Sequence, residues 1–190
     1  MGRVDEISQF WFGDSDNARR ERRVWFVPDP VFDQACTGGF LADHERADAG
    51  ELDDWKDEPR SALALILLFD QFPRNIFRGT ARAFATDRKA LALAKDAVAR
   101  EFDLALPPIQ RVFLYLPFEH SENLNDQSES VRLFRQLAAQ DPAMAGYLKY
   151  AEQHMEVIRR FGRFPHRNAI LGRISTPEEA KFIASSVSPI

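Results

Sequence analysis

The run Ala62–Phe69 constrains this chain more than any other feature, because its eight residues are all apolar. A segment that is apolar on every side has to be covered on every side, so the rest of the fold must surround it. Such a run can be a buried strand or part of a buried helix. Its Leu and Ala content, with Pro59 in a helix-opening position, favours the helix. We therefore predict a central buried helix that begins at Pro59.

The composition of the whole chain also favours helices. Ala and Leu number 41, against 22 for Val, Ile and Thr together, and β-branched residues lose rotamer freedom in a helix. Apolar stripes at helical spacing, separated by prolines, predict about seven helices packed as antiparallel neighbours. One covers about residues 30–44 despite the pair Gly38 and Gly39, another follows Thr86 as its N-cap, and the last follows a capping box at Thr176–Glu179. At 190 residues and 45% apolar content, the chain suits one helical domain, residues 1–190.

The charge balance excludes broad classes of partner. A formal net charge of -4 and a pI near 5.6 argue against a general binder of nucleic acids or anionic membranes. No apolar stretch approaches the ~20 residues that span a bilayer, and the charged N-terminus does not resemble a signal peptide. Cys36 is the single cysteine, which excludes an internal disulfide. We expect a soluble, cytoplasmic protein with no membrane or nucleic-acid partner.

Two segments of the chain nearly repeat each other. The first Arg-Asn segment, residues 69–79, reads Phe-Asp-Gln-Phe-Pro-Arg-Asn-Ile-Phe-Arg-Gly. The second Arg-Asn segment, residues 161–173, reads Phe-Gly-Arg-Phe-Pro-His-Arg-Asn-Ala-Ile-Leu-Gly-Arg. Guanidinium forks match carboxylates and phosphates, and Asn adds a directed amide. The two segments therefore predict a pocket for a small anionic ligand or an acidic peptide end, lined by Arg74, Asn75, Arg163, His166, Arg167, Asn168 and Arg173.

The same arginines have an equally weighted structural interpretation. Arg near the C-terminal end of a helix caps carbonyls and is favoured by the helix dipole. It can also pair with Asp70, Glu119 or Glu122. Asp70 lies near the C-terminal end of the apolar helix, where the dipole disfavours a carboxylate, so it requires an Arg partner. That pair is either structural or a general base held beside an anion site.

The histidines indicate a second kind of chemistry. His120 follows Glu119 in a polar cluster, and His166 lies in the second Arg-Asn segment. His120, Glu119 and Asp70 are therefore candidate catalytic residues, with His120 as a general acid/base helped by a carboxylate. His154 falls on the apolar stripe of a helix and is interpreted as a core residue. The spacing of these groups matches no metal-ligand motif, so we predict no metal site, and no sequence motif identifies a cofactor.

Residues 67–82, which contain the first Arg-Asn segment, resemble a bacterial family of unknown function, number nine-two-four. The resemblance continues through residues 10–13, 83–87, 116–122, 161–168, 171–173 and 175–179, so it spans nearly the whole chain. It implies an all-helical fold similar to tetratricopeptide-like superhelices, and it implies no activity. The motif positions that it carries over are Asp70, Gln71, Arg74, Asn75, Glu119, His120, Arg163, His166, Arg167 and Asn168.

Three hypotheses of function remain open at this point. The leading one is a helical protein whose pocket binds a small anionic ligand or an acidic peptide end. The second is a hydrolase of a phosphate or carboxylate compound, with His120 as the general acid/base. The third treats the motifs as structural and the helical surface as a docking scaffold for another protein, because a fold alone does not specify a function.

Overall fold

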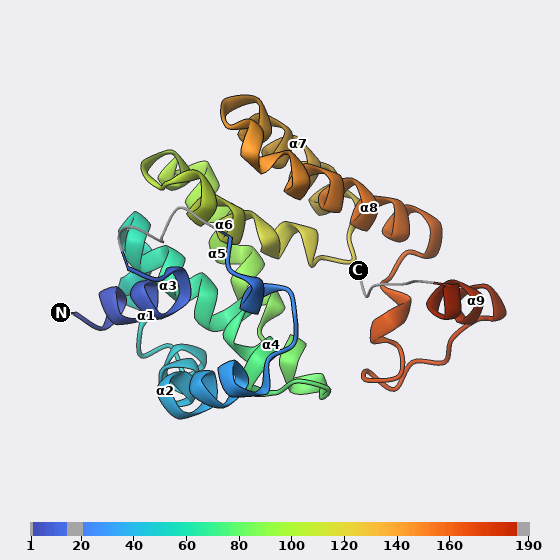
Figure 1. The fold of residues 1–190 in the computed structure, drawn as a ribbon, viewed down its shortest axis with the longest axis horizontal. Coiled ribbons are helices and arrows are strands. Elements are labelled where there is room, and N and C mark those ends of the chain that lie inside the picture. The colour runs from blue at the N-terminus through green and yellow to red at the C-terminus, as the bar shows by residue number, and fades with distance from the viewer. Residues whose placement is uncertain (1, 15–20, 186–190) are drawn as a thin grey trace. The chain divides into compact units, whose positions relative to one another are not determined.

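The computed structural model describes residues 2–14 and 21–185, and every regular element in these ranges is helical (Figure 1). The fold class is therefore all-α, as the composition predicts. The α-helices are α1 Arg3–Phe12, α2 Pro30–Asp48, α3 Pro59–Asp70, α4 Phe72–Ile76, α5 Asp87–Ala99, α6 Pro108–Glu119, α7 Leu124–Gln140, α8 Ala145–Phe161 and α9 Pro177–Ser185. Short 3-10 helices connect them: η1 Arg23–Trp25, η2 Asp53–Asp57, η3 Ala81–Phe84, η4 Phe102–Ala105, η5 Pro142–Met144 and η6 Pro165–Arg167. None of the described helices is long and apolar enough to cross a membrane.

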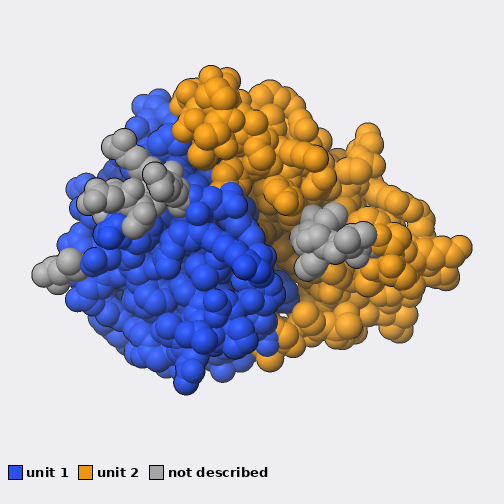
Figure 2. Space-filling model, viewed as in Figure 1, with its two compact units in different colours: residues 1–78, 82–117 blue, residues 79–81, 118–190 orange. Residues whose placement is uncertain are grey.

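The chain divides into two compact units (Figure 2). Unit 1 comprises residues 1–78 and 82–117, and unit 2 comprises residues 79–81 and 118–190. Nearly all of the first Arg-Asn segment therefore belongs to unit 1, and the second belongs to unit 2. The organisation of residues 1–190 as one domain and as a tetratricopeptide-like superhelix stays a prediction.

Helix α3 lies at the centre of unit 1, which confirms the prediction of a central buried helix. Every residue from Ala62 to Asp70 is buried. Pro59 occupies the first turn of α3, where its missing N–H removes no helical hydrogen bond. Helices α1, α2, α4 and α5 and the turn η2 all contact α3. The apolar run is covered because these elements surround it.

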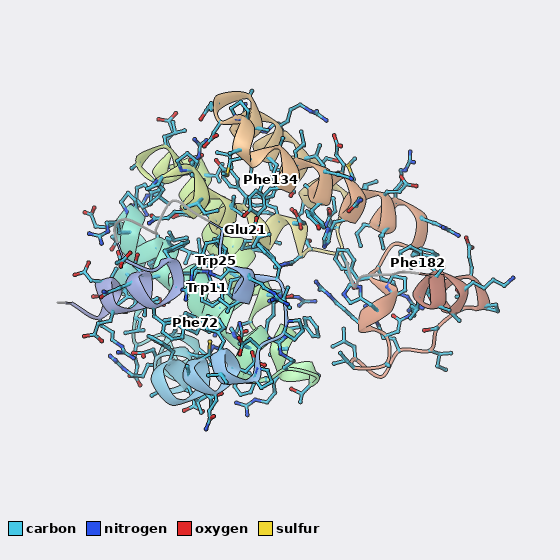
Figure 3. All side chains as sticks on the ribbon, viewed as in Figure 1. Trp11, Glu21, Trp25, Phe72, Phe134 and Phe182 are labelled. Carbon is cyan, nitrogen blue, oxygen red and sulfur yellow. The ribbon has the colours of Figure 1, made fainter. Side chains whose placement is uncertain are left out.

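An aromatic cluster fixes α1 within unit 1. The ring centroid of Trp11 lies 5.2 Å from Phe72 and 5.6 Å from Phe113, and Trp25 lies 4.7 Å from Phe113. Trp11, Trp25 and Phe72 are labelled in Figure 3. Edge-on and tilted contacts of this kind stabilise a core beyond the area they bury. Since Phe72 opens α4, the cluster also positions the first Arg-Asn segment.

Helix α2 is longer than the sequence predicts, because it continues through Gly38 and Gly39 and ends at Asp48. Asp29 caps its first turn by accepting two backbone N–H groups. Its inner face buries a stripe of apolar side chains that offsets the conformational cost of two glycines. These side chains are Phe32, Cys36, Phe40 and Ala47.

The start of α5 differs from the sequence prediction. Thr86 occupies the N-cap position, but its hydroxyl makes no capping hydrogen bond within α5. It donates instead to the carbonyl oxygen of Phe69 at 2.6 Å. Thr86 therefore ties the start of α5 to the end of α3 and satisfies one of the terminal carbonyls of that helix.

In unit 2, α7 and α8 form an antiparallel pair joined through η5 (Figure 1). Phe134 of α7 stacks on Tyr147 of α8 with ring centroids 6.4 Å apart. Gly162 then ends α8 with a φ of 68°, a left-handed conformation that suits glycine at a helix C-cap. The chain continues through η6 to α9, where the rings of Phe161 and Phe182 lie 5.1 Å apart.

The predicted capping box at the start of α9 is confirmed. The N–H of Glu179 donates to Oγ1 of Thr176 at 3.2 Å, and the N–H of Thr176 donates to Oε2 of Glu179 at 2.7 Å. Two N–H groups that the first turn of a helix leaves free are thereby satisfied.

Candidate functional site

In unit 1, Arg74 lies between two carboxylates. Its Nη1 is 3.2 Å from Oδ1 of Asp70 and donates to Oδ1 of Asp87 at 2.9 Å, while Nη2 donates to Oδ2 of Asp87 at 3.1 Å. Asp70 has no exposed surface. Burial acts to lower the pKa of Arg74, but the attraction of Asp70 and Asp87 outweighs it and holds the pKa above the ordinary value. The expected Arg partner of Asp70 is therefore present within the same segment.

The rest of the first Arg-Asn segment is also engaged inside unit 1. The Nδ2 of Asn75 donates to the carbonyl oxygen of Gln71 at 3.0 Å, and its Oδ1 accepts from Arg78 at 3.0 Å. Arg78 in turn forms a bidentate pair with Asp33, with both distances 2.7 Å. These contacts hold the end of α4 against α2, which is the structural interpretation of the segment.

In unit 2, Arg163 forms a bidentate pair with Glu179. Its Nε and Nη2 donate to the two carboxylate oxygens at 2.7 and 2.8 Å. Asn168 supports the same carboxylate, since its Nδ2 donates to Ser175 Oγ at 3.0 Å and to Glu179 Oε2 at 3.3 Å. The hydrogen bond from Arg163, with those from Thr176 and Asn168, lowers the pKa of Glu179 to about 2. Arg163 and Asn168 thus fasten the start of α9.

Glu122 and Arg173 hold the backbone of Phe164 from both sides. Oε1 of Glu122 accepts from the N–H of Phe164 at 2.7 Å, and Nη2 of Arg173 donates to the carbonyl oxygen of Phe164 at 3.0 Å. The two clamping side chains also pair with each other at 2.7 and 3.0 Å. Burial alone would raise the pKa of Glu122, but Arg173 and the Phe164 N–H lower it.

Three polar side chains lie against the ring of Phe164, which is fully buried. The His154 ring lies edge-on at 5.5 Å, the His166 ring lies at 5.6 Å, and the guanidinium carbon of Arg167 lies 4.5 Å from the ring centroid. Nη1 of Arg167 also donates to the carbonyl oxygen of His120 at 3.1 Å, at the end of α6. We call His120, His154, His166 and Arg167 the histidine–arginine cluster.

Gln127 of α7 fixes the backbone that carries His120. Its Nε2 donates to the carbonyl oxygens of Glu119 and Ser121, both at 2.6 Å. The Glu119 carbonyl belongs to the last turn of α6, where a helix leaves its acceptors without intrahelical partners, and Ser121 lies just beyond that turn. Gln127 is fully buried, so the end of α6 is held rigidly beside the cluster.

The cluster keeps two of its imidazoles neutral at pH 7. Burial, together with the charges of His120, Arg167 and His166, lowers the pKa of His154 to about 3. Burial and the charge of Arg167 lower the pKa of His166 to about 4. Nδ1 of His154 lies 2.9 Å from the carbonyl oxygen of Tyr150, which assigns its proton to that nitrogen. Burial and neighbouring basic groups thus lower the pKa of both rings.

A buried carboxylate also borders the cluster. Oε1 of Glu119 lies 3.2 Å from Nδ1 of His154, and both side chains are buried. The prediction that His154 points into the core is confirmed, but it contacts polar groups there as well as Phe164. Among the residues described, no group of three or more His, Cys, Asp or Glu side chains could hold a metal ion.

The predicted site residues thus fall into three sets. Arg74 and Asn75 are engaged within unit 1, with Asp70 beside them. Arg163, Asn168 and Arg173 are engaged within unit 2 by Glu179, Ser175 and Glu122. His166, Arg167, His120 and Glu119 come together with His154 around Phe164. That the two Arg-Asn segments form one pocket stays a prediction.

Sequence reasoning missed two of the acids that engage the arginines, Asp87 and Glu179. Asp87 follows the N-cap of α5, and Glu179 was interpreted only as half of a capping box. No local pattern distinguishes these acids from the others in an acidic chain.

The fold and these motifs define a class of all-α protein in which the arginines of two similar Arg-Asn segments pair with carboxylates of the same chain. The profile of the family described as "Bacterial protein of unknown function (DUF924)" matches residues 7–186, and the chain belongs to this family. The resemblance seen in the sequence is therefore confirmed.

A solved structure shares this fold. It is the structure of a protein of unknown function from Agrobacterium tumefaciens, which is 41% identical to this chain. The similarity covers 96% of this chain and 97% of that chain, with a TM-score of 0.84. No curated protein matches the chain.

Proposed function

We propose that this protein binds a small anion, such as the phosphate or carboxylate group of a metabolite or of an acidic peptide end, at the histidine–arginine cluster of unit 2. The observation that carries the proposal is the convergence of His154, His166 and Arg167 on the ring of Phe164. Arg167 supplies a fixed positive charge beside this ring, the two neutral imidazoles supply hydrogen-bonding groups, and a bound anion would neutralise that charge.

The mutual effects of these side chains support the proposal. Each of the two lowered histidine pKa values has neighbouring basic groups among its causes. A negative ligand would reverse that effect and favour the imidazolium forms, which are hydrogen-bond donors at both nitrogens. His120 and His166 are only half-buried, so a ligand can reach them from solvent.

The surrounding contacts give the cluster a rigid frame. Glu122 and Arg173 clamp Phe164, and Gln127 fixes the end of α6. Nε of Arg173 is buried and has no hydrogen-bond partner among the residues that the structure describes. A buried donor without an acceptor destabilises the protein, and a hydrogen bond to a ligand oxygen or a water molecule would remove this cost. Arg167 and His166 would contact the anion, and the other residues would position them.

A hydrolase is the second candidate function, favoured by the carboxylate–imidazole contact of Glu119 and His154. Such a pair orients an imidazole for proton transfer. A pKa of about 3 makes His154 itself a weak base at pH 7, so His120 is retained as the proposed general acid/base. Turnover of a phosphate or carboxylate ester that is lost in His120→Ala, with phosphate binding intact, would support this function. Turnover unchanged by that variant would remove His120 from the mechanism.

The anion proposal is tested by an NMR titration of the histidine rings with inorganic phosphate. Phosphate should raise the pKa of His166 from about 4, because bound negative charge favours the imidazolium. At about a hundred times its dissociation constant, it should add roughly 2.7 kcal/mol of stability, or roughly 5–10 °C in Tm. The docking-scaffold hypothesis predicts neither effect.

Two variants make the titration specific. Arg167→Gln and His166→Gln should each abolish most of the phosphate response, and His166→Gln changes a half-buried position at little cost to folding. Arg135→Gln is the matched control, because Arg135 is an exposed α7 residue that pairs with Glu152. A phosphate response that survives in both cluster variants, or that never appears in the wild type, would contradict the proposal.

A further inference from the structure

Unit 1 contains a groove that the Arg-Asn segments do not explain. It lies between the C-terminal end of α2, η2 and α5, with α3 beneath it, and its volume is about 520 Å³. Pockets that bind small molecules have volumes of ~300–1,000 Å³. Its apolar lining comes from Ala47, Ala49, Leu65, Phe69, Ala92 and Leu93, and its polar lining from Asp48, Asp53, Lys56, Lys89 and Asp96.

The charged lining of this groove has a small negative excess, with Asp48, Asp53 and Asp96 against Lys56 and Lys89. Residues 48–58 contain six carboxylates and one lysine, of which Asp48, Asp53 and Lys56 line the groove on the side of α2 and η2. The C-terminal end of α2, a helix of 19 residues, also points its carbonyls at the rim. The end of a helix carries about half a negative elementary charge. Both features favour a cation over an anion.

The contacts of Lys89 show which chemical group this part of the groove accepts. Its Nζ donates to the carbonyl oxygen of Asp48 at 2.6 Å and to Oδ1 of Asp48 at 2.5 Å. The same ammonium lies 5.9 Å from the centroid of the Phe69 ring. A carboxylate, a main-chain carbonyl at a helix end and an aromatic ring together form a place for a primary ammonium group.

We propose that the groove of unit 1 binds a small organic amine with an apolar body. The ligand ammonium pairs with Asp48 and displaces or shares the position of the Lys89 ammonium. Its apolar body lies along Ala92 and Leu93 of α5. Lys89 is half exposed, so it can swing into solvent when the ligand enters. This site is independent of the anion site proposed for unit 2.

The test uses phenethylamine as the probe and 3-phenylpropionate as a control of similar size and opposite charge. Binding is followed by chemical-shift changes of the backbone amides of residues 47–56 and 88–96. Phenethylamine should shift these amides in a saturable way, and 3-phenylpropionate should not. A response to 3-phenylpropionate that equals or exceeds the amine response overturns the proposal.

Variants at the rim give opposite expected signs. Asp48→Asn should weaken phenethylamine binding about tenfold, which corresponds to about 1.4 kcal/mol. Lys89→Ala should strengthen it about three- to tenfold, because the internal competitor for Asp48 is removed. Asp54→Asn, which removes an exposed carboxylate outside the groove lining, should change affinity less than about twofold. Absence of binding in both the wild type and Lys89→Ala, or weaker binding in Lys89→Ala, overturns the proposal.

Discussion

At the scale of single residues, the neighbours of each arginine determine what it does. Arg74 is placed between the carboxylates of Asp70 and Asp87, and Asp70 has no exposed surface. A carboxylate buried in this way needs a paired cation, because transfer of an isolated charge out of water is costly. Arg74 is therefore first a structural residue, whatever else it contacts.

Arg74→Ala should destabilise the protein by about 3 kcal/mol, since it leaves the Asp70 carboxylate buried without its Arg74 partner. Arg78→Ala is the matched control, because it removes a pair with Asp33 at a more exposed site and should cost less than about 1 kcal/mol. Urea unfolding of both variants measures the difference. Equal losses in the two variants would show that Arg74 is not a buried partner of the kind described.

A second residue-scale prediction concerns Gly38 in α2. Apart from its chain neighbours and the nearby backbone of its own helix, no atom lies within 4 Å of a Cβ built at this position, and the residue is exposed. Gly38→Ala should therefore stabilise the protein by about 0.5–1 kcal/mol, because alanine loses less backbone entropy in a helix interior. Thermal unfolding checks the sign of the change. A lower Tm would mean that α2 is not a continuous helix through this position.

At the scale of elements, α9 depends on contacts that come from outside its own nine residues. A helix of this length is marginal by itself in water. The capping box at its start and the bidentate pair with Arg163 both use the carboxylate of Glu179. The tilted contact between the rings of Phe161 and Phe182 supplies the apolar contact. One carboxylate thus links the second Arg-Asn segment to the last helix.

Glu179→Gln should increase hydrogen exchange of the α9 amides while leaving α3 protected. The neutral amide cannot replace the charged acceptor that serves Arg163 and the Thr176 N–H. Glu178→Gln is the control, because Glu178 pairs with Arg160 on the exposed side of the same turn and should change exchange little. Similar exchange in the two variants would remove Glu179 from its role as the anchor of α9.

At the scale of the whole molecule, the two histidines with lowered pKa values make folding stability depend on pH. The folded protein holds His154 with a pKa of about 3 and His166 with a pKa of about 4, both below the ordinary 6.5. Below pH 6.5 the unfolded chain binds protons that the folded protein does not. Stability is therefore complete above that pH and falls as the pH is lowered, until the folded pKa values are reached.

The predicted slope is at most about 1.4 kcal/mol per pH unit for each histidine. Urea unfolding between pH 7.5 and 5 measures it in a range where carboxylates of ordinary pKa remain charged. His154→Gln should reduce the slope by about half, because it removes one of the two shifted groups and leaves His166. A stability that is constant over this range would mean that both rings titrate normally in the folded protein.

Some of the architecture could be predicted because it depends on local chemistry. The apolar run Ala62–Phe69 specified a buried helix, since the segment has no polar face that could be exposed to water. The pattern Thr176-Pro-Glu-Glu specified a helix start, since the reciprocal hydrogen bonds of a capping box join residues three apart. The inward direction of His154 followed from the 3.6-residue period of α8.

Other predictions were incomplete because the deciding contact was not local. Thr86 was expected to cap α5, and its hydroxyl bonds the end of α3 instead. The extent of α2 beyond residue 44 depended on a buried stripe that offsets two glycines. For the candidate site, the division of the residues of the two segments between structural pairs and the histidine–arginine cluster was not foreseen.

The sequence by itself determined the helical class, the central helix and the positions of the polar motifs, because periodicity, capping and composition act over a few residues. Only the tertiary structure decided which acid pairs with which arginine. Arg173 pairs with Glu122, 51 residues away, and Arg163 with Glu179, 16 residues away. The chain has 29 acidic side chains, and the attraction between charges depends on their distance in space and not on their separation in the sequence. Packing around Phe164 and α9 selects the partners and leaves the histidines gathered beside Arg167.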